Sequence, residues 1–259
     1  MKYYVVDAFA QSVFGGNPAG ICVLEKPLPT ETMQMIATEN NLSETAFVYK
    51  NGFGNYDLRW FTPKAEIDLC GHATLGTAYV ICHFVDPDVE KMAFSTLSGI
   101  LTVKRKENRF EMDFPSRMPE KITITQEMID AIGVKPKEAY LSRDLVLVFD
   151  DEKNVEKLNP DFQKVFELEV GLGLVVTAKG TRYDFVSRCF YPKLGVNEDP
   201  VTGSAHSSLI PLWAEKLEKN SLVAKQVSKR GGVLTCCNVG ERVEIGGEAI
   251  LYLQGEIYI

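Results

Sequence analysis

The side chains best suited to proton transfer stand in two short segments of the first half of the chain. Glu44 directly precedes a β-prone apolar run, and Cys70 and His72 flank a glycine just before an apolar helical segment. Carboxylates and imidazoles are the usual general acids and bases of enzymes, and a thiolate can also accept a proton. These residue types indicate acid–base chemistry on a small molecule.

Each of these residues also has a purely structural explanation. The segment 41–44 has the spacing of a helix capping box, although the residues after Glu44 favour a strand. His72 could be a packed imidazole in the first turn of a helix, and Cys70 a small buried hydrophobe. Spacing alone leaves both interpretations open.

A third candidate segment, 199–204, lies in the second half of the chain. Asp199 followed by Pro200 is typical of a helix N-cap with proline in the first turn, and Ser204 would then be a first-turn hydroxyl. Exposed backbone N–H groups at the start of such a helix also attract anions. The segment is therefore a candidate carboxylate site as well as a candidate cap.

An internal repeat relates the candidate segments to each other. A pattern of four residues recurs 129 positions later: Arg59, Phe61, Pro63 and Lys64 return as Arg188, Phe190, Pro192 and Lys193. At this offset Cys70 corresponds to Asp199, whereas Gly173 stands where a counterpart of Glu44 would be. The repeat predicts two similar domains whose helix starts face one cleft, with catalytic groups that are not symmetric.

The domain boundaries follow from this duplication. We expect one domain over 1–117 and a second over 118–247, because the Pro-rich segment near 115–120 breaks the pattern. The strand-like tail 248–259 follows the second repeat, and we expect it to return to the first domain. The active site is expected in the cleft between the domains.

Hydrophobic periodicity and turn residues predict the elements of both halves. In the first half we expect strands at 3–6, 21–24, 45–49, 56–61, 100–103 and 109–114, and helices at 30–40, capped by Thr30, and 73–84, with a turn-rich loop at 15–20. In the second half we expect helices at 125–132, ended by Gly133, and 200–217, and strands at 140–149, 172–178, 182–189, 233–237 and 242–245.

Composition excludes several classes of function. The net charge of −7 argues against nucleic-acid binding, which needs a basic surface, and no apolar run is long enough to cross a membrane. The six cysteines show no zinc-binding spacing, and no secretory signal is seen, so we expect a reduced cytoplasmic protein without metal. The lack of a glycine-rich dinucleotide loop or Walker motif makes redox and phosphoryl chemistry unsupported.

Four motifs in order resemble the PhzF-like proteins of phenazine biosynthesis, which share the diaminopimelate-epimerase fold. They are VDAFAQSVFGGNPAG, NNLSETAFV, RWFTPKAEIDLCGHATLGTA and EDPVTGSAHSSL, and the resemblance covers essentially the full length. It implies an α+β fold of two pseudo-symmetric domains, each a curved, mostly antiparallel sheet or barrel around a central helix. It also implies a cofactor-independent acid–base isomerase, often a homodimer.

The resemblance assigns roles to particular residues. Glu44 would carry the proton, while His72, Asp199 and Ser204 would orient the substrate and complete the catalytic set. The substrate carboxylate would be held by Asn17 and by groups at the helix starts. These additional binding residues are Cys70, Gly71, Thr202 and Gly203.

One departure limits how far the fold's chemistry can be transferred. Epimerases of this fold use a cysteine at each of two related positions, whereas this chain has Cys70 at the first and Asp199 at the second. We therefore predict a PhzF-like isomerase that acts on a small carboxylate. The alternatives are an amino-acid racemase or epimerase that uses Cys70 as one base, and a non-catalytic binding or scaffold protein on the same fold.

Overall fold

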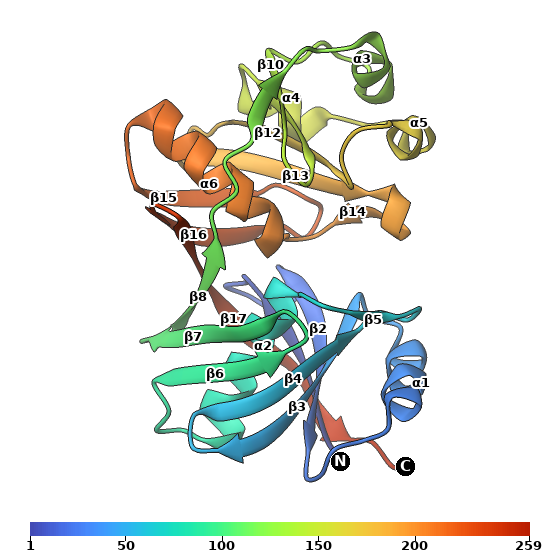
Figure 1. The fold of residues 1–259 in the computed structure, drawn as a ribbon, viewed down its shortest axis with the longest axis vertical. Helices are drawn as coiled ribbons and strands as arrows, with labels where there is room; N and C mark the ends of the chain where they lie inside the picture. The colour runs from blue at the N-terminus through green and yellow to red at the C-terminus, as the bar shows by residue number, and fades with distance from the viewer. The chain divides into compact units, whose positions relative to one another are not determined.

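The chain forms two compact units in the computed structural model, which describes residues 1–259 (Figure 1). The first unit comprises 1–114 and 245–259, and the second comprises 115–244. The C-terminal tail is part of β17 (Arg242–Glu256), a long strand that begins in the second unit and ends in the first. The two chain ends lie side by side, and the Met1 amino group donates to the Ile257 carbonyl over 3.0 Å.

The first unit is a closed barrel. Going around it, the strands are β1 (Lys2–Ala8), β2 (Asn17–Leu24), β3 (Glu44–Gly52), β4 (Asn55–Phe61), β6 (Lys91–Thr96), β7 (Gly99–Lys106), β8 (Arg109–Pro115) and β17. Strand β17 pairs with both β8 and β1 and so closes the sheet. A short strand, β5 (Glu66–Ile67), pairs with the end of β4. Closure leaves no open edge among these eight strands.

Helix α2 (Gly71–Val80) fills this barrel. Nine of its ten residues are buried, and the chain continues as the π-helix η1 (Ile81–Val85). The helix is rich in small residues because the strands come close: a Cβ at Gly76 would lie 3.3 Å from the Ile21 side chain. Packing in the barrel therefore fixes where the first turn of α2, with His72, must lie.

Helix α1 (Thr30–Asn40) covers the outside of the first unit. Its residues Met33, Ile36 and Ala37 are buried in a cluster with Phe47 and Phe61. The range predicted for this helix is confirmed, but the predicted cap is wrong. Pro29 occupies the N-cap position, and Thr30 is already helical.

The second unit repeats this plan with different lengths. Its strands are β9 (Glu120–Ile122), β10 (Glu138–Leu141), β11 (Leu145–Phe149), β12 (Leu174–Lys179), β13 (Phe185–Tyr191), β14 (Val196–Asp199), β15 (Ser221–Gln226) and β16 (Gly232–Val239), with the 3₁₀ turn η2 (Pro192–Leu194) after β13. Its helices are α3 (Gln126–Ile132), α4 (Glu152–Lys157), α5 (Phe162–Glu167) and α6 (Gly203–Leu217). Eleven of the fifteen residues of α6 are buried, so α6 is the counterpart of α2. These two sheet-and-helix units confirm the predicted α+β class.

The repeated sequence pattern has the same structural role in both units. Arg59 donates from Nε and Nη2 to the two carboxylate oxygens of Glu66, over 2.6 and 2.7 Å, and Arg188 does the same to Glu198 over 2.7 and 3.0 Å. Each guanidinium also lies over the phenyl ring two residues later, 5.2 and 5.1 Å from its centre. The repeat therefore preserves the hairpin that leads into each central helix.

Several predicted elements differ from the structure. The range 140–149 is two antiparallel strands rather than one, because 142–144 forms their turn. Strand β2 begins at Asn17, inside the predicted loop 15–20. Strands β6, β9 and β15 and helices α4 and α5 were not predicted, being short or without clear periodicity.

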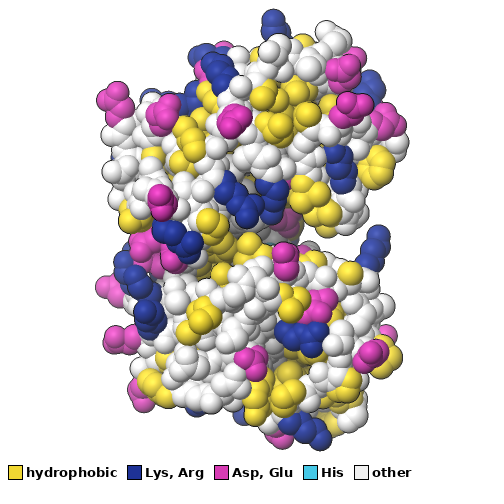
Figure 2. Space-filling model, in the orientation of Figure 1, with side chains coloured by type: hydrophobic (Ala, Val, Ile, Leu, Met, Phe, Trp, Pro, Cys, Tyr) yellow, Lys and Arg dark blue, Asp and Glu magenta, His cyan; other side chains and the backbone are white.

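The surface carries charges of both signs. Figure 2 shows acidic and basic side chains interspersed on the face it presents, rather than one extended basic region. No helix of the chain is both long enough and apolar enough to span a bilayer. All six cysteines are free, and five of them are buried.

Candidate active site

Three elements of the first unit bring the predicted site residues of that unit together. Asn17 begins β2, Glu44 begins the parallel neighbour β3, and His72 lies in the first turn of α2. Because β2 and β3 are paired in parallel, with Ala19 opposite Glu44, their starts lie at one end of the barrel. The capping-box explanation of Glu44 is wrong, since no helix starts there.

The His72 imidazole is the centre of this cluster. Its Nε2 atom lies 3.0 Å from Glu44 Oε2. Its Nδ1 atom lies 3.3 Å from the Asn17 side-chain nitrogen and 3.6 Å from Cys70 Sγ. Apart from this contact, neither Glu44 Oε2 nor His72 Nε2 has a hydrogen-bond partner, although both atoms are buried. The Glu44 carboxylate oxygen and the His72 ring nitrogen are therefore each other's polar contact in the buried site.

Burial and charge act in opposite directions on this cluster. Burial alone would lower the pKa of His72, but the adjacent Cys70 sulfur and Glu44 carboxylate raise it well above its ordinary value. Burial raises the pKa of the Cys70 thiol, although His72 opposes that shift. The arrangement favours a protonated imidazole between the Glu44 carboxylate and the Cys70 sulfur. The Asn17 side-chain amide can donate a hydrogen bond to an unprotonated Nδ1 or accept one from a protonated Nδ1, since it has an NH₂ group and a carbonyl oxygen.

Glu44, Cys70 and His72 are also residue types that bind metal ions, and their donor atoms lie within 4.8 Å of one another. The contacts are nevertheless arranged as a chain. Glu44 meets one ring nitrogen and Cys70 meets the other, so the imidazole stands between them. A single ion bound by all three would need one ring nitrogen to face both partners. The observed geometry fits proton transfer along the chain better than chelation.

The second unit places Asp199 at the end of β14, not at the start of the helix. Helix α6 begins at Gly203 with Thr202 at its N-cap, so the predicted Asp199 cap and the predicted helix start at Pro200 are wrong. Asp199 Oδ2 accepts a hydrogen bond of 2.5 Å from the Thr202 hydroxyl. Strand pairing holds the backbone here, since Asp199 lies opposite Cys189 of β13.

A buried glutamine fixes this loop. Gln226 Nε2 donates to the Asp199 carbonyl over 2.7 Å, and its Oε1 accepts from the Thr202 backbone N–H over 2.9 Å. Its side chain is inaccessible to solvent. The loop between Asp199 and Thr202 is therefore held at both ends by one amide, a role that no local sequence pattern indicates for Gln226.

Ser204 belongs to a second network in this unit. Its hydroxyl oxygen accepts a hydrogen bond of 3.1 Å from Arg143 Nη2. The same guanidinium is paired with Asp144 at 2.8 Å and contacts the Tyr191 hydroxyl at 3.3 Å. Arg143 and Asp144 were not predicted as site residues because they lie within the range 140–149, which was expected to be one continuous strand.

In each unit, the structure places the predicted site residues at the start of the central helix and on the strands next to it. The group in the first unit is Asn17, Glu44, Cys70, Gly71 and His72. The group in the second unit is Asp199, Thr202, Gly203 and Ser204. Their catalytic and binding roles stay predictions.

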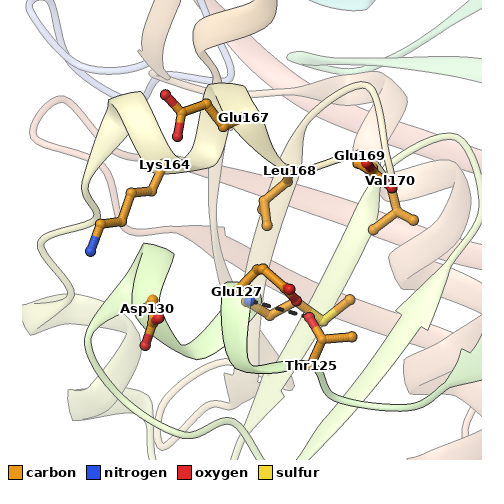
Figure 3. Close-up of a pocket in the computed structure, with 9 residues that line it drawn as sticks. Thr125, Glu127, Asp130, Lys164, Glu167, Leu168, Glu169 and Val170 are labelled. Carbon is orange, nitrogen blue, oxygen red and sulfur yellow. Dashed lines mark hydrogen bonds between the residues drawn. The ribbon is translucent and has the colours of Figure 1, made fainter.

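A separate hollow of about 510 Å³ lies between α3 and α5 of the second unit (Figure 3). Its walls include Met128, Leu168 and Val170, together with the side chains of Glu127 and Lys164. None of the predicted site residues lines it. The hollow therefore lies apart from the Glu44, Cys70 and His72 side chains in which the sequence indicates acid–base chemistry.

Sequence comparison links the chain to one family over nearly its full length. The profile of the family described as phenazine biosynthesis-like protein (PhzC-PhzF) matches residues 6–255. An uncharacterized isomerase of Pseudomonas aeruginosa is 49% identical over 259 residues, covering 100% of this chain and 99% of the relative. A phenazine biosynthesis-like domain-containing protein of Mus musculus is 37% identical over 289 residues, covering 99% of each.

Structural comparison gives the same grouping. A crystal structure of a PhzF-family protein from Enterococcus faecalis has a TM-score of 0.98 and 54% identity, covering 100% of this chain and 99% of that one. A probable proline racemase from Agrobacterium radiobacter has a TM-score of 0.65 at 8% identity, covering 100% of this chain and 93% of that one. The second similarity extends the shared fold to racemases.

Proposed function

Because the chain belongs to the phenazine biosynthesis-like (PhzC-PhzF) family, we propose that it is a cofactor-independent isomerase that moves a proton within a small carboxylate-bearing substrate. Relatives named as isomerases support isomerase activity in general. The observation that carries the finer proposal is the buried 3.0 Å contact between Glu44 and His72. A carboxylate held in this way is a suitable proton carrier.

In the proposed reaction, Glu44 removes a proton from a carbon of the substrate. The C–H bond breaks, an O–H bond forms on Glu44, and the electron pair is delocalised into the substrate's conjugated or carboxylate system. Glu44 then returns the proton to a different carbon, so the product is an isomer and nothing is consumed. The His72 imidazolium stabilises the Glu44 carboxylate before and after the transfer.

The remaining predicted residues would bind and orient the substrate. We propose that Asp199 and Ser204 act on the same substrate as Glu44, and that backbone groups at Gly71 and Gly203 contribute to carboxylate binding. Support comes from the first-turn backbone N–H groups of α2 and α6, which have no acceptor within their own helix. Asn17 would hold His72 in place through Nδ1.

The test is the replacement Glu44→Gln, which keeps the shape of the side chain and removes its ability to accept a proton. Wild-type and variant protein are incubated in D₂O with a panel of carboxylates, including proline, hydroxyproline, methylitaconate and a dihydro-hydroxyanthranilate. Proton NMR then follows loss of C–H signals and product formation. We expect turnover of at least one compound by the wild type and none by the variant. Full activity of Glu44→Gln would refute the assignment.

A second candidate is supported by the 3.6 Å contact between Cys70 Sγ and His72 Nδ1. In this case Cys70 would be one base of a racemase or epimerase, activated as a thiolate by the imidazolium. Wild-type protein would then exchange the α-proton of an amino acid, and Cys70→Ala would not. Retention of all exchange activity by Cys70→Ala would exclude this role.

We further propose that the protein is a homodimer and acts in the cytoplasm. The homodimer rests on the resemblance to PhzF-like proteins, and the location rests on the free cysteines. Light scattering coupled to size-exclusion chromatography tests the first proposal: a mass near 57.8 kDa, twice the 28.9 kDa of one chain, is expected. A mass near 28.9 kDa would contradict it.

A further inference from the structure

We propose that Arg143 and Ser204 form a receptor for the substrate carboxylate in the second unit, with Arg143 as a binding residue and Asp144 and Tyr191 as the groups that position it. The proposal rests on the proposed function for the presence of a carboxylate substrate. Its own evidence is the way in which the hydrogen-bonding groups of Arg143 are used. The chemical class of the ligand is a planar monocarboxylate.

One edge of the Arg143 guanidinium is fully occupied within the protein. Nε lies 3.3 Å from both carboxylate oxygens of Asp144, and Nη2 lies 2.8 Å from its Oδ2. The Tyr191 hydroxyl donates to the same Oδ2 over 3.1 Å. Asp144 and Tyr191 are almost completely buried, at 4% and 5% exposure, so the support for this edge is rigid.

The other edge has donors that the protein does not use. Nη2 donates to Ser204 Oγ over 3.1 Å, and no protein atom accepts a hydrogen bond from Nη1. Since the Ser204 oxygen already accepts from Arg143, the hydroxyl proton must point away from the guanidinium. No protein acceptor for that proton is found either. Two adjacent donors, Nη1–H and Ser204 Oγ–H, are thus available to one ligand.

These donors fit a carboxylate better than a neutral group. One oxygen of a planar carboxylate can accept from the guanidinium while the other accepts from the hydroxyl. Burial alone would lower the pKa of Arg143, but Tyr191 and Asp144 raise it, so the guanidinium stays charged. About one third of its side chain is exposed, so a ligand can reach Arg143 from solvent.

Arg188 shows how the fold can use the second edge of an arginine that forms such a fork. Arg188 is 12% exposed and also forms a fork with a carboxylate. However, its Nη1 donates to three backbone carbonyls, those of Val155, Glu156 and Leu158. All its nitrogens are therefore engaged in holding the fold. Arg188 is the matched control for a structural arginine.

The loop that carries Arg143 is fixed against α6. The Ser142 hydroxyl is hydrogen-bonded to the Ser208 hydroxyl over 2.7 Å, one helical turn after Ser204. Arg143 is also 5.9 Å from the centre of the Tyr191 ring, within the range of a cation–π contact. The guanidinium therefore needs little reorganisation to meet a ligand, which lowers the entropic cost of binding.

The test measures carboxylate binding directly, with two probe pairs: benzoate with benzamide, and acetate with acetamide. Isothermal titration at pH 7 compares the wild type with Arg143→Lys, which keeps the charge but removes the fork. In at least one pair we expect the wild type to bind the carboxylate at least about 10-fold more tightly than the amide, and Arg143→Lys to weaken carboxylate binding about 10- to 100-fold. Amide binding should change less than about twofold, because the amide gains little from the charge.

Two further variants separate binding from stability. Arg188→Lys should lower the melting temperature but leave carboxylate affinity within about twofold of the wild type. Ser204→Ala should fold normally and weaken carboxylate binding about 3- to 10-fold, and it replaces Arg143→Lys as the deciding variant if the latter does not fold. No preference for carboxylates in the wild type would overturn the proposal, as would unchanged affinity in the deciding variant.

A failure of the proposed carboxylate receptor can be distinguished from a failure of the proposed reaction. Glu44→Gln alters the proton carrier and should leave carboxylate affinity unchanged. If Glu44→Gln kept full turnover while Arg143→Lys lost carboxylate binding, the reaction proposal would fail and the receptor would stand. If Glu44→Gln lost turnover while Arg143→Lys bound carboxylates like the wild type, only the receptor would fail.

Discussion

His206 should make the folded protein lose stability as the pH falls below neutral. The imidazole is completely buried in α6, and its Nδ1 atom lies 2.8 Å from the Thr202 carbonyl oxygen. The carbonyl can only accept, so Nδ1 carries the proton and Nε2 does not. Burial lowers the pKa of His206 to about 4, although the Thr202 carbonyl opposes that shift.

The sign of the effect follows from the two states of the chain. In the unfolded chain this histidine binds a proton below about pH 6.5, whereas in the folded protein it stays neutral down to about pH 4. Acid therefore favours the unfolded state within this window. Protonation of His206 in the unfolded chain can lower the free energy of unfolding by about 3 kcal/mol in full. About 2 kcal/mol of this decrease should occur between pH 7.5 and pH 5.

The perturbation is His206→Gln, whose amide can still donate to the Thr202 carbonyl but cannot titrate. Urea unfolding gives the free energy of unfolding of both proteins at pH 7.5 and at pH 5. We expect the wild type to lose about 2 kcal/mol more than the variant over this interval. Equal losses in the two proteins would refute the reasoning, as would a His206 signal titrating near pH 6.5 in NMR spectra of the folded wild type.

Two other perturbations test the fold that carries the site. Gly16→Ala should destabilise the protein by about 2 kcal/mol or more, because Gly16 has a φ of +62° and a Cβ there would lie 2.1 Å from the Ala8 carbonyl oxygen; urea unfolding measures this loss, and an unchanged midpoint would contradict it. Arg188→Lys should lower the free energy of unfolding by about 2 kcal/mol, and Arg59→Lys by about 1 kcal/mol. The Arg188 side chain is less exposed, at 12% against 32%, and it donates to more partners. Thermal unfolding compares the two variants, and the reverse order would disprove this explanation.

The sequence predicted the large features of the fold because the duplication repeats them. The Arg59 and Arg188 patterns mark equivalent hairpins, and the apolar segments after them mark the two central helices. Local residue propensity predicts the backbone less well where tertiary contacts determine its conformation. Asp199-Pro200 has the residue types of a helix start, yet strand pairing with Cys189 and the hydrogen bonds of Gln226 keep this segment outside α6.

The candidate site was predictable only in part. Glu44 and His72 could be named from residue type and family resemblance, and the fold brings them to 3.0 Å. Arg143 could not, because a turn of three residues between two apolar strands looks like one longer strand. Its relation to Ser204 joins residues 61 positions apart, which no local pattern encodes.

The central claim is that the proton carrier is the carboxylate of Glu44 and not the thiol of Cys70. The most direct measurement is the rate of solvent-deuterium incorporation into a turned-over substrate, compared for wild type, Glu44→Gln and Cys70→Ala under identical conditions. We expect Glu44→Gln to lose incorporation by a factor of at least about 1000, and Cys70→Ala to stay within about 10-fold of the wild type. Loss of incorporation in Cys70→Ala with retention in Glu44→Gln would contradict the account.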